Sequence, residues 1–354
     1  MVKENSTSIS RKSNIELLRI FAILMVLTLH YLNPNMGGAL KEINKGDTYY
    51  YVIKAIESFS IIAVNLFIII SGYFMVNSKK VSLSKIVNLA LLAYFYGVIL
   101  YLFSVIIGKS NFGYGELIRS FNISLSGGYW FIQSYIILYL LSPYINIMLN
   151  NINKKNHEIL IIISLLFFSI WPSFFDNAPK NDSGYGIITF IILYIIGNYI
   201  RRYFNSNKNF IHFFSVYVLC SIITTIAPKL NLKGYWDYNF IFNIIGAISL
   251  FMAFIKLDIK AKWINKISTF VFAVYIIHVN PYISKFLYID ILKCNLFYNS
   301  KYFIFHMILS ILFIFILCLL IEVMRRYLIT IIIKILKKVG YRKKDKGSYF
   351  IEVN

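Results

Sequence analysis

Long apolar stretches separated by short polar loops recur from one end of this chain to the other. A helix needs about 20 apolar residues to cross the hydrocarbon core of a membrane. Reading stretches of about 17–25 residues as spans predicts ten transmembrane helices, at about 15–32, 52–76, 83–107, 129–149, 158–175, 185–200, 210–227, 239–256, 264–289 and 302–322. The pattern therefore predicts an all-α, polytopic integral membrane protein, with residues 1–336 as a single transmembrane domain and 337–354 as a basic cytoplasmic tail.

The composition supports one membrane domain. Of the 354 residues, 58% are hydrophobic and 14% are charged, and the mean hydropathy is +0.67. A soluble domain has about 25% charged residues. Apolar stretches leave no room for a separate soluble module, so the length alone, which would allow about two domains, does not decide the number.

The net charge of +21 does not indicate a nucleic-acid partner, because the basic residues lie in the short loops between apolar stretches. The amino terminus, the alternate loops on its side and the carboxyl end carry 24 of the 36 Lys and Arg residues, and the other loops carry 11. Cytoplasmic loops are enriched in Lys and Arg, so we expect both termini in the cytoplasm. Attraction to anionic membrane lipid accounts for the basic tail. A cleavable signal peptide is the alternative for the first stretch, but its buried arginine and the many later spans favour an uncleaved helix.

The first apolar stretch carries Arg19 and His30 among its apolar residues. Eleven positions are close to three helical turns, so both side chains point the same way, about 16 Å apart along the axis. Ionisable side chains at membrane depth usually mark function. As an alternative, Arg19 can be an anchor at the membrane surface that pairs locally with Glu16. His30 can be a hydrogen-bonded core residue. Their shared face favours the functional interpretation.

Three further segments carry polar or aromatic residues at the ends of predicted spans. The second span ends in Ser71-Gly72-Tyr73, near the expected level of Arg19, and Lys79 and Lys80 follow. Small residues also serve helix packing, and the lysines also fit topology. A phosphorylated ligand would nonetheless meet several cations on this side.

The fourth predicted span begins on the outer side of the membrane, and the ninth ends there. The fourth begins with Tyr129 and Trp130, with Gln133 one turn further in. Aromatic residues at a membrane edge are usually anchors, but they can also stack on a sugar ring, with Gln133 bonding a hydroxyl. The ninth span places His278 at a depth comparable to that of His30. The three cysteines (Cys220, Cys294 and Cys318) form no CxxC pair, so we predict neither a disulfide framework nor a metal site.

Together these residues resemble the membrane-bound acyltransferase type 3 family, the integral-membrane O-acyltransferases of bacterial surface glycans. The similarity covers most of the chain, and it lies in the spacing of Arg19 and His30 and in three segments. These are the segment ending in Ser71-Gly72-Tyr73, the Tyr129-Trp130-Phe131 segment leading to Pro143, and Tyr275-Ile276-Ile277-His278. Glu16 stands where the family has an acidic residue, and Lys79 and Lys80 replace arginines often found after the second span.

The resemblance implies a ten-helix core in a bacterial cell membrane, an acyl-CoA donor, most simply acetyl-CoA, and transfer to a hydroxyl of a surface polysaccharide or its lipid-linked precursor. It implies that Arg19 binds or orients the donor and that His30 is the catalytic histidine. We expect Ser71, Gly72, Tyr73, Lys79 and Lys80 on the donor side.

On the acceptor side we expect Tyr129, Trp130 and Gln133, with Glu16 and His278 in support. His30 would act as general base or form an acyl-imidazole. The alternatives are an exporter of polysaccharide or lipid-linked sugars, a non-catalytic scaffold of a glycan-assembly complex and, more weakly, a glycan polymerase.

Overall fold

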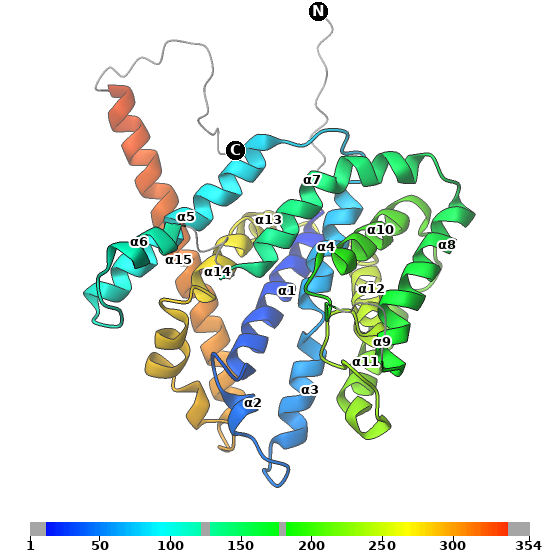
Figure 1. The fold of residues 1–354 in the computed structure, drawn as a ribbon, viewed down its shortest axis with the longest axis horizontal. Helices are drawn as coiled ribbons and strands as arrows, with labels where there is room; N and C mark the ends of the chain where they lie inside the picture. The colour runs from blue at the N-terminus through cyan, green and yellow to red at the C-terminus, as the bar shows by residue number, and fades with distance from the viewer. Residues whose placement is uncertain (1–11, 122–127, 177–181, 339–354) are drawn as a thin grey trace, which may run out of the picture.

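The computed structural model describes residues 12–121, 128–176 and 182–338, and all regular structure in these ranges is helical (Figure 1). The first half of the chain forms α1 (Ser13–Leu32), α2 (Ala39–Glu42), α3 (Tyr50–Ser60), α4 (Ala63–Phe74), α5 (Leu83–Ile106), α6 (Tyr114–Phe121), α7 (Trp130–Asn150), α8 (Lys154–Leu165), η1 (Leu166–Ile170) and α9 (Trp171–Phe174). The second half forms α10 (Ile187–Tyr203), α11 (Phe210–Ile226), η2 (Ala227–Leu230), α12 (Ile241–Ile255), α13 (Lys262–Ser268), α14 (Val271–His278), η3 (Phe286–Ile291), η4 (Cys294–Leu296) and α15 (Phe303–Lys338).

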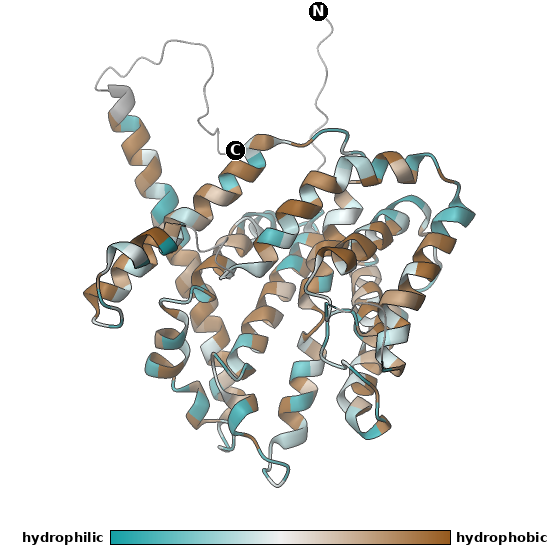
Figure 2. Cartoon of the chain, viewed as in Figure 1, coloured by the Kyte–Doolittle hydropathy of each residue, from teal (hydrophilic) through white to brown (hydrophobic). Residues whose placement is uncertain are grey.

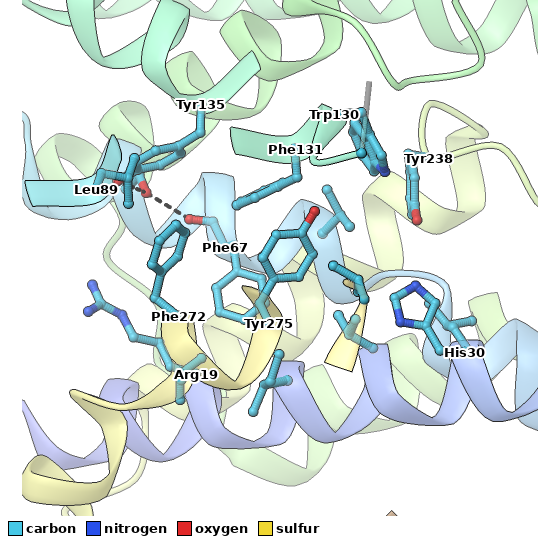
Figure 3. Close-up of a pocket in the computed structure, with 18 of the residues that line it drawn as sticks. Arg19, His30, Phe67, Leu89, Trp130, Phe131, Tyr135, Tyr238, Phe272 and Tyr275 are labelled. Carbon is cyan, nitrogen blue, oxygen red and sulfur yellow. Dashed lines mark hydrogen bonds between the residues drawn. The ribbon is translucent and has the colours of Figure 1, made fainter. Parts of the chain in front are cut away.

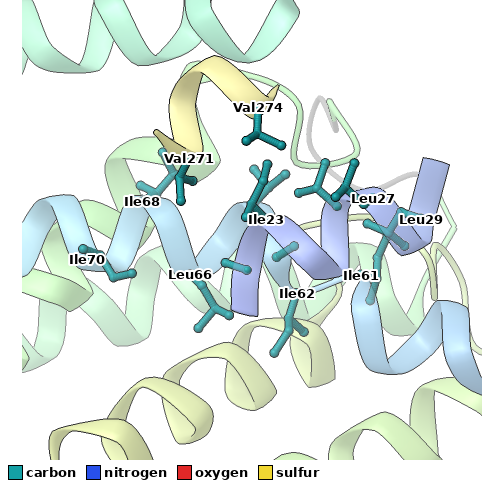
Figure 4. Packing of buried hydrophobic residues seen from close by; sticks show 14 of the residues in the cluster. Ile23, Leu27, Leu29, Ile61, Ile62, Leu66, Ile68, Ile70, Val271 and Val274 are labelled. Carbon is teal, nitrogen blue, oxygen red and sulfur yellow. The ribbon is translucent and has the colours of Figure 1, made fainter. Parts of the chain in front are cut away.

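Helix α1 lies in the middle of the bundle, where it packs against α3, α4, α12, α13, α14 and α15 (Figure 1). A helix that is apolar around most of its circumference is buried by neighbours on several sides. Ile23 and Leu27 of α1 are fully buried beside Leu66 of α4 and Val274 of α14 (Figure 4). The predicted Arg19 and His30 are therefore carried by a helix that neighbours enclose on several sides.

Within the described ranges, seven helical segments are long and apolar enough to cross a membrane. Figure 2 shows apolar residues along the helices and many of the hydrophilic ones in the connecting loops. This supports a multi-pass membrane protein but not the predicted count of ten. Two predicted spans, 185–200 and 239–256, correspond to α10 and α12, which have only 17 and 15 residues.

The ninth predicted span, 264–289, is not one helix. It is divided into α13, α14 and the π-helical turn η3, with breaks at Thr269–Phe270 and after His278. Asn280 is followed by Pro281, which has no backbone N–H and disfavours a helical conformation in the residue before it. The apolar composition suggested a continuous span, but the proline ends α14 directly after His278.

The tenth predicted span ends too early, at residue 322, because charged residues follow it. In the structure α15 continues past these charged residues to Lys338. Glu322 is fully buried and accepts hydrogen bonds from Tyr96 of α5, Arg325 and Arg326. These partners satisfy the carboxylate inside the bundle. Helix α1 begins and α15 ends toward the same side of the molecule (Figure 1).

Helices α4 and α10 approach closely through two glycines. A Cβ atom on Gly72 would lie 2.2 Å from the carbonyl oxygen of Tyr194, and one on Gly197 would lie 2.3 Å from that of Ile69. Small residues allow helix backbones to come this near in membrane proteins. Gly72, which the sequence suggested for donor binding, therefore lies in this helix contact.

Candidate active site

A cavity of about 480 Å³ runs beside α1, between α4, α7 and α14 (Figure 3). Arg19 and His30 lie toward opposite ends of it along α1, as their spacing predicts (Figure 3). Its lining is mostly apolar and aromatic with a few polar groups, which is typical of small-molecule sites. The lining residues are Arg19, Ile23, Val26, Leu29, His30, Met36, Val64, Phe67, Ser71, Leu89, Gly128, Trp130, Phe131, Tyr135, Tyr238, Ser268, Val271, Phe272, Tyr275 and Val279.

At one end of the cavity, two histidines from different helices form a direct contact. Nδ1 of His30 lies 2.8 Å from Nε2 of His278, and Nδ1 of His278 lies 2.5 Å from the carbonyl oxygen of Val274. His278 is fully buried, whereas His30 is half-buried and lines the cavity. His278 therefore stands behind His30, away from any molecule that occupies the cavity.

These contacts define the tautomers of the neutral pair. A carbonyl oxygen only accepts hydrogen bonds, so Nδ1 of His278 carries a proton and its Nε2 is the acceptor. Nδ1 of His30 then donates to His278, which leaves a free lone pair on Nε2 of His30. A base oriented by a second group in this way is a recurrent arrangement in catalytic sites. The pair thus presents Nε2 of His30 as a proton acceptor.

A buried network holds the end of α14, which carries His278. The hydroxyl of Tyr129 donates to the carbonyl of Ile276 at 3.0 Å and accepts from Nδ2 of Asn280 at 2.9 Å. Tyr129 has no exposed surface. Tyr129, which we expected on the acceptor side, thus has an enclosed ring, and its hydroxyl positions the segment that follows His278.

At the other end of the cavity, Arg19 combines a local ion pair with an aromatic contact. Its guanidinium lies 3.6 Å from the carboxylate of Glu16, the partner expected from the sequence, and 5.7 Å from the ring centre of Phe74. About a third of the Arg19 side chain remains exposed (33%), compared with 7% for Glu16. Because Arg19 keeps exposed surface and lines the cavity, its guanidinium is accessible to a ligand.

Aromatic side chains form the wall above His30. The ring of Trp130 stacks on that of Tyr238 with centroids 5.7 Å apart, and it lies 4.6 Å from that of Tyr185 (Figure 3). Tyr275, one helical turn before His278, faces Phe131 at 5.5 Å. Burial raises the pKa of Tyr238 well above its usual value, so this phenol stays neutral and can donate a hydrogen bond.

The other predicted site residues are distributed around this cavity. Ser71 lines it, and its hydroxyl donates to the carbonyl oxygen of Phe67 at 2.8 Å and lies 3.4 Å from the hydroxyl of Tyr135. Tyr73 does not line the cavity, and its hydroxyl accepts hydrogen bonds from Lys12 and Arg201. Gln133, Lys79 and Lys80 are not among the lining residues, and the two lysines are exposed.

Sequence reasoning missed several aromatic lining residues. Tyr275 had a local signal, because it precedes His278 by one helical turn and lies in a segment that carries the resemblance. Tyr238 had none, because it comes from the loop before α12 and reaches Trp130 only through tertiary packing. Tyr135 and Phe272 resembled ordinary apolar helix positions.

The fold and the cavity define a multi-pass helical membrane protein with a histidine pair inside the bundle. A comparison with protein families gives its class: the model described as "Acyltransferase domain" matches residues 12–325. The chain therefore belongs to the acyltransferase type 3 family, which confirms the resemblance seen in the sequence and identifies an acyltransferase. No curated protein and no solved structure matches the chain.

Proposed function

We propose that this protein transfers an acyl group, most simply acetyl, from cytoplasmic acetyl-CoA to a hydroxyl of a cell-surface polysaccharide or its lipid-linked precursor, in a bacterial cell membrane. The observation that carries the proposal is a cavity with Arg19 at one end and the His30–His278 pair at the other. An elongated donor with an anionic end and a reactive thioester end matches this separation of charge and base.

The donor would lie along α1. Its phosphates would approach Arg19, whose planar guanidinium suits phosphate oxygens, and its arm would pass the apolar residues Ile23 and Val26, which line the cavity between the two ends. The thioester would then lie beside His30. The acceptor would enter past Trp130 and Tyr238, where aromatic faces can stack on a sugar ring and the Tyr238 hydroxyl can donate.

The transfer step uses Nε2 of His30 as general base. The acceptor hydroxyl gives its proton to this nitrogen while its oxygen attacks the thioester carbonyl carbon. The tetrahedral intermediate collapses, the carbon–sulfur bond breaks, and the CoA thiolate takes the proton back from His30. The products are an ester and free CoA. His278 stabilises the intermediate imidazolium by accepting from its Nδ1–H, and general base catalysis of this kind contributes about 10²–10⁴-fold.

A covalent route uses the same nitrogen. Nε2 of His30 would attack the thioester first, CoA would leave, and the acceptor hydroxyl would then attack the acyl-imidazole. Release of CoA in the absence of acceptor, as a burst equal to the enzyme concentration, would identify this route.

The decisive experiment measures CoA release and ester formation by the purified full chain with acetyl-CoA and oligosaccharide acceptors. We expect His30→Ala to lose transfer, while the exposed His212→Gln on α11 retains it. Full transfer by a folded His30→Ala protein would refute the mechanism.

Glycan export without acyl-CoA consumption would favour an exporter, and loss of a glycan-assembly complex without loss of acylation would favour a scaffold. NMR of glycans from cells with and without the chain would identify the acceptor.

A further inference from the structure

Two cations converge on one tyrosine hydroxyl at the Arg19 end of the bundle. Nζ of Lys12 and Nη1 of Arg201 each donate to the hydroxyl oxygen of Tyr73, both at 3.2 Å. They also face the ring, with Lys12 Nζ at 5.5 Å and Arg201 Cζ at 5.0 Å from its centre. Lys12 comes directly before α1, Arg201 is in the last turn of α10, and Tyr73 is in the last turn of α4.

In the described part of the chain, no carboxylate pairs with either of these two cations. Neither Lys12 nor Arg201 forms an ion pair with a carboxylate there, although eight other cation–carboxylate pairs are present. Arg202, the neighbour of Arg201, donates to Asn198, Leu149 and Asn150. Like charges this close repel each other, so an anion between them would relieve the repulsion.

Tyr73 adds a third donor to the two cations. Its oxygen already accepts two hydrogen bonds, which uses both lone pairs. Its O–H remains to donate, and none of the described residues accepts from it. Tyr73 is only 5% exposed, so its ring is held firmly by the bundle. One ammonium, one guanidinium and one hydroxyl pointing to the same space are the donor set that a phosphate group takes.

The cluster lies beyond the Arg19 end of α1, outside the lining of the cavity. Lys12 precedes Arg19 by seven positions, so it lies on nearly the same face of α1, about 10 Å further from His30. The ring of Tyr73 also lies 5.3 Å from that of Phe74, which faces the Arg19 guanidinium. A ligand that extends from His30 past Arg19 therefore meets Lys12, Arg201 and Tyr73 next.

We infer that Lys12, Arg201 and Tyr73 bind the 3′-phosphate on the adenosine ribose of the acyl-CoA donor, while Arg19 meets the diphosphate. The inference rests on the proposed function, because it takes acyl-CoA as the donor. It moves the outermost donor contact from Lys79 and Lys80 to a cluster in which a buried phenol holds both cations. A lipid headgroup offers the same phosphate chemistry, so the experiment must separate the two sources.

The test measures binding of CoA and of 3′-dephospho-CoA to the full chain in nanodiscs of zwitterionic lipid. We expect the wild type to bind CoA about tenfold more tightly, the order expected for charge-assisted hydrogen bonds. Arg201→Gln and Lys12→Gln should bind the two ligands with nearly equal affinity, and Tyr73→Phe, which keeps the ring, should lose part of the preference. Lys155→Gln removes the same charge from an exposed position on α8 and should keep the preference.

The outcomes distinguish this inference from the proposed function. If the wild type binds CoA but shows no preference over 3′-dephospho-CoA, or if Arg201→Gln keeps the preference, the 3′-phosphate assignment is overturned and CoA as donor stands. If phosphatidylglycerol raises the thermal stability of the wild type but not of Arg201→Gln, and no preference for CoA is seen, the cluster holds a lipid phosphate and the assignment is wrong. If the wild type binds no CoA, the proposed function fails first.

Discussion

His30 and His278 lie 248 positions apart in the chain, and their ring nitrogens are 2.8 Å apart in the structure. The contact joins the last turn of α1 to the last residue of α14, which ends there because Pro281 follows closely. The backbone carbonyl of Val274 holds the proton of His278 on its Nδ1, and Nε2 of His278 in turn holds the proton of His30 on its Nδ1. The short helix α14, which ends before a proline, thereby orients Nε2 of His30 toward the cavity.

His278→Ala should slow acyl transfer by about 10²-fold or more, because His30 loses the group that orients it and stabilises its charged form. Donor affinity should change little, since His278 does not line the cavity. Transfer rates and CoA binding by the same protein samples check both statements. His212→Gln serves as the control variant. A folded His278→Ala protein with the wild-type rate would show that His30 works alone.

Arg19→Lys should weaken binding of CoA by about tenfold, because a lysine keeps the charge but loses the planar, bidentate donor group. The effect should appear in donor affinity rather than in acceptor affinity, which titrations with each ligand separate. Arg119→Lys, in an exposed pair with Glu116 on α6, is the matched control. An unchanged CoA affinity for Arg19→Lys would mean that the position supplies only positive charge.

Gly197→Ala should destabilise the contact between α4 and α10 by about 1–3 kcal/mol, the usual cost of overpacking a close contact. Its added Cβ would meet backbone atoms, the Ile69 oxygen at 2.3 Å and the Tyr73 nitrogen at 3.0 Å, which have little freedom to move. Gly246→Ala is the control, because its Cβ would have an ordinary 3.5 Å contact with Cys220. Thermal unfolding in detergent measures both, and equal stability of the two variants would contradict the prediction.

Glu322→Gln should lower the free energy of unfolding by about 3 kcal/mol, because it leaves Arg325 and Arg326 without their shared carboxylate in a largely apolar setting. Arg326 also donates to Thr269 between α13 and α14, at 3.2 Å from the hydroxyl and 2.9 Å from the carbonyl. We therefore expect the start of α14 to loosen as well. Asp258→Asn breaks an exposed pair with Lys260 and should have almost no effect. A Glu322→Gln protein as stable as Asp258→Asn would show that both arginines reach solvent.

The sequence by itself determined the class of the protein, because membrane spans and helix faces are local properties. Apolar stretches of sufficient length predict helices, and a spacing of 11 residues places Arg19 and His30 on one face whatever surrounds them. The same local reasoning failed where a span was interrupted, as at Pro281, and where charged residues continue a buried helix, as at Glu322, Arg325 and Arg326.

Tertiary structure alone decided which side chains meet. His278 reaches His30, Tyr238 reaches Trp130, and Lys12 and Arg201 reach Tyr73 only because helices distant in sequence pack side by side. The burial of Tyr129 and its bond to the carbonyl of Ile276 likewise depend on the packing of α7 against α14. Helical periodicity sets the direction of a side chain relative to its own axis, but the neighbour that it meets depends on how whole helices pack, which no single segment encodes.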